Sequence, residues 1–85
     1  MEGFQVFASL DEAQEILKEE FEPFPRRLPA RVKDGLDDEY KECRFEWLGH
    51  GTLPSGSHVA VMKIKGGKRV MLLPSSKVIP LSCRL

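Results

Sequence analysis

The sequence predicts an α+β domain, with an N-terminal strand and an amphipathic helix ahead of four or five antiparallel strands. The chain has 85 residues, a length that fits one domain with a modest core. Apolar residues recur at helical spacing only near the N-terminus, and from residue 28 onward they alternate with a period of two. We therefore expect one domain over 1–85, with a strand plus helix over 1–22, a proline-rich connector over 23–29 and an antiparallel β module over 30–85.

The N-terminal segment carries the clearest local signals. Residues 4–8, FQVFA, are aromatic and β-branched, which favours a strand. Ser9 and Glu12 have the spacing of a capping box, which marks the start of a helix. We expect the helix to cover 10–22 and to end at Pro23, because proline cannot continue it. Its apolar face is predicted to contain Leu10, Ala13, Ile16, Leu17 and Phe21, and its acidic face Glu12, Glu15, Glu19 and Glu22.

The alternation after the connector predicts strands that are buried on one face. Leu28, Ala30 and Val32 fall on one side of the first strand. In the next strand Cys43, Phe45 and Trp47 point one way, whereas Glu42, Arg44 and Glu46 point the other way.

The segments 58–65 and 68–74 predict a β-hairpin around Gly66 and Gly67, because glycine accepts the positive φ angles of a two-residue turn. That register pairs Met62 with Met71 and Lys63 with Val70. It places Lys63, Lys65 and Lys68 together on one face near the turn, with Arg69 on the other face.

The C-terminal run MLLPSSKVIPL, residues 71–81, resembles the end of SH3-like barrels, including those of the Tudor type. In such barrels a proline and serine open a short 3₁₀ turn before the last strand. The resemblance covers residues 28–82 and implies that the β module is an SH3-like small barrel or curled sheet. Lys77 stands where an aromatic residue would help to line a proline-binding groove, so we do not expect recognition of proline-rich peptides. Phe45 and Trp47 are expected in the core rather than in an aromatic cage.

Charge is distributed unevenly along the chain. Residues 1–42 contain twelve acids and six bases, a net charge of −6, and residues 43–85 contain seven bases and one acid, a net charge of +6. Either one half neutralises the other within the fold, or the second half presents a surface to an anion.

No catalytic, metal or membrane motif emerges from the residue pattern. His50, His58, Cys43 and Cys83 do not have the spacing of a zinc site, and whether the two cysteines lie close together stays open. Turn sequences account for Ser55, Ser57, Ser75 and Ser76, and no serine or cysteine has a sequence setting that marks a nucleophile. We expect a non-enzymatic, cytoplasmic protein without a cofactor and without a membrane segment.

Three functions fit these observations. The first is a small protein-interaction or adaptor module, whose partner is another protein or a second copy in a homodimer. The second is nucleic-acid binding through the basic hairpin over 61–73, although a pI of 6.7 is low for a dedicated binder. Its candidate contacts are Lys63, Lys65, Lys68, Arg69 and Lys77. The third is an acidic inhibitor or immunity-type protein that acts through the helix 10–22.

Overall fold

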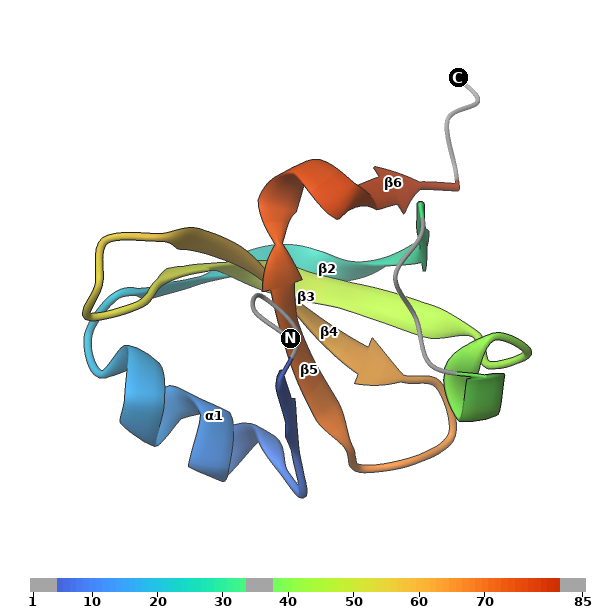
Figure 1. Ribbon diagram of the computed structural model, residues 1–85, viewed down its shortest axis with the longest axis horizontal. Helices are drawn as coiled ribbons and strands as arrows, with labels where there is room; N and C mark the ends of the chain where they lie inside the picture. The colour runs from blue at the N-terminus through green and yellow to red at the C-terminus, as the bar shows by residue number, and fades with distance from the viewer. Residues whose placement is uncertain (1–4, 34–37, 82–85) are drawn as a thin grey trace.

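The structure is a computed structural model that describes residues 5–33 and 38–81. Within these ranges the chain forms one α-helix, six strands and two 3₁₀ turns around a curled sheet (Figure 1). In chain order the elements are β1 (Gln5–Phe7), α1 (Leu10–Leu17), β2 (Phe21–Val32), η1 (Asp38–Tyr40), β3 (Phe45–Thr52), β4 (His58–Ile64), β5 (Val70–Pro74), η2 (Ser75–Lys77) and β6 (Val78–Pro80).

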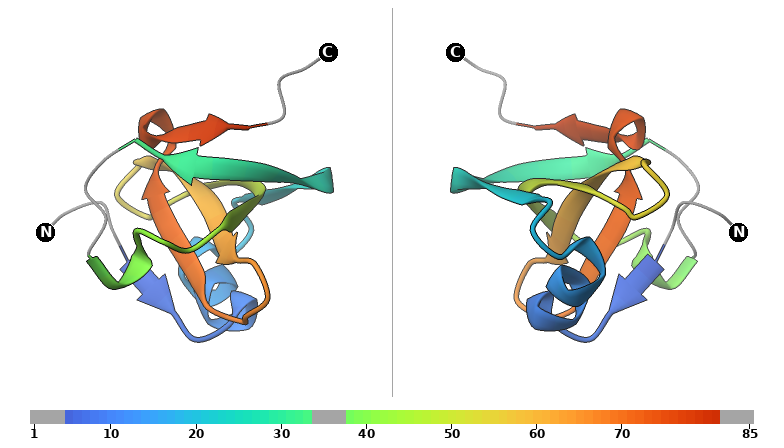
Figure 2. Two further views of the ribbon diagram at one scale, coloured as in Figure 1. Left: turned by 90° about the vertical axis from the view of Figure 1, so that its right-hand side faces the viewer. Right: turned by 90° about the vertical axis from the view of Figure 1, so that its left-hand side faces the viewer.

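All six strands belong to one antiparallel sheet in the order β1-β5-β4-β3-β2-β6. The predicted α+β class with a curled antiparallel sheet is therefore confirmed, and its shape is compatible with a small barrel (Figure 2). The sheet has six strands rather than four or five, because β1 also pairs with β5, Val6 lying opposite Met71. No helix in the described ranges is long and apolar enough to cross a membrane.

The helix is shorter than the predicted span of 10–22. Ser9 occupies the N-cap position with an extended backbone, but its side chain makes no capping bond. Glu12 Oε1 accepts a hydrogen bond at 3.2 Å from the N–H of Ala8, the residue before the N-cap, rather than from the N-cap itself as in a capping box. Lys18 has a φ of 57° and its N–H donates to the Gln14 carbonyl, which closes the helix. The prediction that Pro23 ends the helix is therefore wrong.

The predicted proline-rich connector over 23–29 is also wrong, because these residues lie inside the 12-residue strand β2. Phe21 pairs with Gly51 of β3 instead of extending the helix. Prolines are tolerated in β2 because β6 pairs with this strand only over Ala30–Val32, so the earlier residues lie at an edge. A register shift between Pro23 and Leu28 leaves a further stretch without β3 partners, and β2 bends sharply along its length (Figure 2).

Two hydrophobic clusters lie on opposite faces of the sheet. The first fills the inside of the curl, and the second lies between the sheet and α1. The hairpin of β4 and β5 contributes to both, so its apolar residues are buried on each face. The predicted hairpin register is confirmed, with Met62 opposite Met71 and Lys63 opposite Val70. The buried members of the first cluster are Ala30, Tyr40, Phe45, Ala60, Met62, Met71, Leu73 and Val78, and those of the second are Ala13, Leu17, Leu48, Val59, Val61, Val70 and Leu72.

Strands β2 and β3 approach each other closely at Gly49. A β-carbon placed on Gly49 would lie 2.7 Å from the Pro23 Cα and would collide with the Glu22 carbonyl. Beside it, β3 contains one extra residue between the pairs Trp47–Met62 and Gly49–Val61, which is a β-bulge at Leu48. The bulge directs Leu48 into the cluster beneath α1. It also reverses the alternation of the strand, so that Trp47 and His50 fall on the same face.

Neighbouring aliphatic residues at the end of α1 provide a test of this packing. Leu17 is 1% exposed and Ile16 is 39% exposed, although both were predicted on the buried face. We expect Leu17→Ala to lower the free energy of unfolding by about 2–5 kcal/mol, and Ile16→Ala to change it by about 0.5 kcal/mol or less. Urea unfolding followed by circular dichroism measures both values. Equal losses for the two variants would contradict the observed orientation of α1.

Candidate anion-binding face

A group of basic residues gathers on the outer face of β2, β3 and β4, beside the part of the sheet that α1 covers. Pro29, Glu46 and Lys63 are cross-strand partners, and such partners share a face of a sheet. Alternation then places Arg31 of β2 on this face. It also places there Arg44, which precedes β3, and Lys65, which follows β4. We call this surface the basic face; its cations are Arg27, Arg31, Arg44, Lys63, Lys65 and Lys68.

The centre of the basic face is a hollow of about 480 Å³. Four cations line it, and the one acid among its lining residues is Glu46. The Arg27 Nη1 lies 3.3 Å from the Glu46 Oε1, which ties the Arg27 guanidinium to the sheet. The Lys65 N–H donates to the Arg44 carbonyl at 2.9 Å, which joins the start of the β4–β5 turn to the residue before β3. The lining residues are Arg27, Pro29, Ala30, Arg31, Cys43, Arg44, Phe45, Glu46, Lys65 and Leu81.

A second, smaller hollow of about 240 Å³ extends the basic face towards the start of α1. Arg27 borders both hollows, and Lys63 and Lys68 line the second one together with Asp11. Across the two hollows the described lining residues comprise six bases and two acids, a net charge of 6 − 2 = +4. Like charges this close together repel one another, so a bound anion would relieve that repulsion.

The three predicted turn lysines all lie on the basic face, but they line different hollows of it. Gly67 N–H donates to the Ile64 carbonyl, and of the two turn glycines only Gly66 has a positive φ, 86°. The turn is therefore not the predicted two-residue connection, and β4 and β5 are not paired at Lys65 and Lys68. Lys63 and Lys68 line the second hollow, whereas Lys65 lines the first.

The other two predicted basic contacts lie elsewhere. The Arg69 Nη1 is 3.7 Å from a Glu39 carboxylate oxygen and 3.5 Å from the Tyr40 hydroxyl, so it faces η1. Lys77 belongs to η2, which follows the end of β5 opposite the β4–β5 turn. Neither residue lines the two hollows of the basic face.

Three arginines of the basic face were missed as candidates by sequence reasoning. The alternation did place Arg31 and Arg44 on the outward side of their strands, but it did not show that these strands are neighbours. Arg27 was assigned to the connector, where no face could be predicted for it. The pairing of Pro29 with Glu46 brings these segments together.

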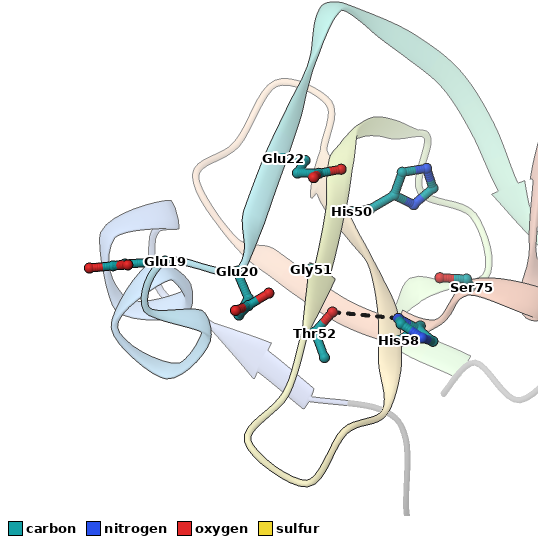
Figure 3. A pocket seen from close by; sticks show the side chains of 8 residues that line it. All are labelled: Glu19, Glu20, Glu22, His50, Gly51, Thr52, His58 and Ser75. Atoms are coloured by element: carbon teal, nitrogen blue, oxygen red, sulfur yellow. Dashed lines mark hydrogen bonds between the residues drawn. The ribbon is translucent and has the colours of Figure 1, made fainter.

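Acidic residues gather at the other end of β2, around a hollow of about 370 Å³ (Figure 3). Of the predicted acidic face, Glu12 and Glu15 lie on α1, whereas Glu19 and Glu22 lie beyond its end and line this hollow. In Figure 3 the dashed line joins Thr52 Oγ1 and His58 Nδ1, which are 3.4 Å apart. The full lining is Glu19, Glu20, Glu22, His50, Gly51, Thr52, His58 and Ser75.

Metal ligands are not assembled in the parts of the chain that the structure describes. No group of three or more histidine, cysteine or acidic side chains there could hold a metal ion. His50 and His58 do line one hollow, as their positions around the loop allowed. Cys43 is a free thiol, and Cys83 lies outside the described residues.

Three rings pack together next to the acidic hollow. Phe24, Trp47 and His50 make edge-on contacts with centroid separations of 5.0–5.4 Å. The Trp47 Nε1 donates to the Gly49 carbonyl at 3.0 Å, which fixes the indole. Trp47 is thus packed against the core on one side and against these two rings on the other. Phe24 lies in the irregular part of β2, so the ring cluster supports the bend of this strand.

Comparisons of the chain with protein-family models, curated proteins and solved structures found no match. The function is therefore argued from the geometry of the surface.

The two histidines of the β3–β4 hairpin form a matched pair for testing the ring cluster. We expect His50→Ala to lower the free energy of unfolding by about 1 kcal/mol and to shift the emission of Trp47, because its ring contacts are lost. His58→Ala should leave the emission unchanged and cost about 0.5 kcal/mol or less. Trp47 is the sole tryptophan, so its fluorescence during urea unfolding reports both quantities. The contact is refuted if the two variants have the same emission spectrum.

Proposed function

We propose that this chain is a non-catalytic binding module whose basic face holds the phosphate backbone of a nucleic acid. The main support for the proposal is the composition of the first hollow, in which Glu46 is the one acid among the lining residues. The cations that line it are Arg27, Arg31, Arg44 and Lys65. A polyanion with regularly spaced charges can engage several of these cations at once and release its counterions.

The kind of cation supports a phosphate ligand. Three of the six cations on the basic face are arginines, whose planar guanidinium groups bind phosphate oxygens in a bidentate manner. The acidic hollow lies at the other end of β2, so its negative charge does not cover the basic face. The near-neutral pI of the chain is therefore compatible with a local binding surface.

We also propose that β2 to β6 form an SH3-like barrel. Support comes from the connectivity: β2, β3, β4 and β5 pair in sequence, η2 follows β5 directly, and β6 returns to pair with β2. The 3₁₀ turn η2 between β5 and β6 is the step that the run over 71–81 predicted from its resemblance to SH3-like barrels. In this proposal α1 and β1 are additions to the barrel: α1 packs on the outer face of the sheet, and β1 extends the sheet beside β5.

Protein interaction remains the alternative function. The acidic hollow with its two histidines is the surface that we would assign to it, for a partner that presents basic side chains. Self-association into a homodimer and an inhibitor role for the acidic residues stay predictions of the same kind. A titration with nucleic acid separates these hypotheses from the proposal.

Charge reversal on the basic face tests the proposed function. We expect Arg44→Glu combined with Lys65→Glu to weaken binding of a fluorescently labelled oligonucleotide by tenfold or more. The slope of log affinity against log salt should fall by roughly 1.5–2, because about two phosphate contacts are lost. Fluorescence anisotropy over a range of salt concentrations measures both quantities.

Lys18→Glu is the control, since Lys18 is exposed at the end of α1 near the acidic hollow. Lys77→Glu reports on the cation that the structure places away from the basic face. Both single variants should bind within about twofold of the parent, a small change because rim charges act at long range and are screened. Absence of salt-dependent binding by the parent protein would refute the proposal, and equal losses in all variants would refute the assigned surface.

A further inference from the structure

We infer that the first hollow of the basic face takes an unstacked nucleobase, so that the chain binds single strands in preference to duplexes. This inference rests on the proposed function and specifies its ligand. The starting observation is that the hollow is not lined by charge alone. Its lining also includes Pro29, Ala30, Phe45 and Leu81, of which Pro29 and Leu81 are exposed.

Part of the apolar lining of the hollow is exposed. Leu81 is 52% exposed, the largest exposed fraction among the large hydrophobic residues of the described chain. Its N–H donates to the Pro29 carbonyl at 2.9 Å, so the backbone holds Leu81 beside β2. An inorganic anion could pair with the surrounding cations, but it would leave this apolar surface in water. A ligand that fits the whole site combines a flat apolar part with a negative charge next to it.

A nucleotide unit of a single strand has this composition. The volume of about 480 Å³ lies within the ~300–1,000 Å³ typical of small-ligand sites. A base in the hollow would cover Leu81 and Pro29, while its flanking phosphates would meet the cations at the rim. In a duplex the faces of the bases are stacked against one another, and only base edges and the backbone are accessible.

Arg27 provides a second surface for a base. Its guanidinium is tied to Glu46 at 3.3 Å, which restricts the side chain before a ligand arrives. An arginine held in this way presents a flat cationic face, on which bases stack. Arg27 also borders the second hollow, where Lys63 and Lys68 would meet the next phosphates. The two hollows together therefore suit a strand that crosses β2, β3 and β4 rather than a single nucleotide.

The experiment compares a labelled oligothymidine of about ten nucleotides, within the ~4–16 nucleotides that small single-strand binders cover, with a duplex of the same length. We expect the parent protein to bind the single strand at least tenfold more tightly at equal salt.

Two aliphatic variants then distinguish contact with the base from contact with the phosphates. Leu81→Ala should weaken single-strand binding about fivefold or more, because apolar cover is lost. For Leu81→Ala the slope of log affinity against log salt should equal that of the parent, because no phosphate contact changes.

Ile16→Ala is the matched control, because Ile16 is an exposed aliphatic residue on α1, outside the basic face. It should bind both nucleic acids as the parent does. Equal or tighter binding of the duplex, or full single-strand affinity in Leu81→Ala, overturns the inference and leaves the proposed function standing. If neither nucleic acid binds, the proposed function falls together with the inference.

Discussion

The close approach of β2 and β3 at Gly49 is the constraint on which the surface of this domain depends. A side chain at this position would strike the Glu22 carbonyl and the Pro23 backbone, so the two strands can meet here only because the residue is glycine. Directly beside it the bulge at Leu48 reverses the alternation of β3. The first part of β2 therefore pairs with the end of β3, and after its bend β2 pairs with the start of β3 and with β6.

This path of β2 determines which charges become neighbours. The bent strand carries Glu22 at one end and Arg27 and Arg31 along the rest. Its pairing with β3 brings the arginines to Arg44, and the β4–β5 turn adds lysines to the same face. The acidic hollow forms where β2 begins. The ion pair Arg69–Glu39 joins a base of the second half of the sequence to an acid of the first half. The basic face and the acidic hollow lie at different ends of β2.

The sequence was most informative where local spacing alone determines the structure. The register of the β4–β5 hairpin followed from a central turn and from alternating apolar residues, and it was correct even though the turn itself is longer than expected. The prediction for residues 18–29 failed because proline was treated as a bar to strand structure. Proline removes only the backbone N–H donor at its own position in a strand. Whether that hydrogen bond is needed depends on pairing partners that lie far along the chain. The arginines of the basic face were missed for the same reason: Arg27, Arg31 and Arg44 are neighbours through strand pairing, which no local pattern reveals.

In the proposed mode of binding, one continuous surface of β2, β3 and β4 contacts the ligand. An NMR titration of the ¹⁵N-labelled protein with oligothymidine tests it most directly, because each backbone amide reports on its own surroundings. We expect the largest changes in amide chemical shift on the basic face, at Arg27, Arg31, Arg44, Lys65 and Leu81. The amide shifts of Glu20, Glu22 and His58 at the acidic hollow should remain unchanged. Shifts centred on the acidic hollow, or confined to Arg69 and Lys77, would contradict it.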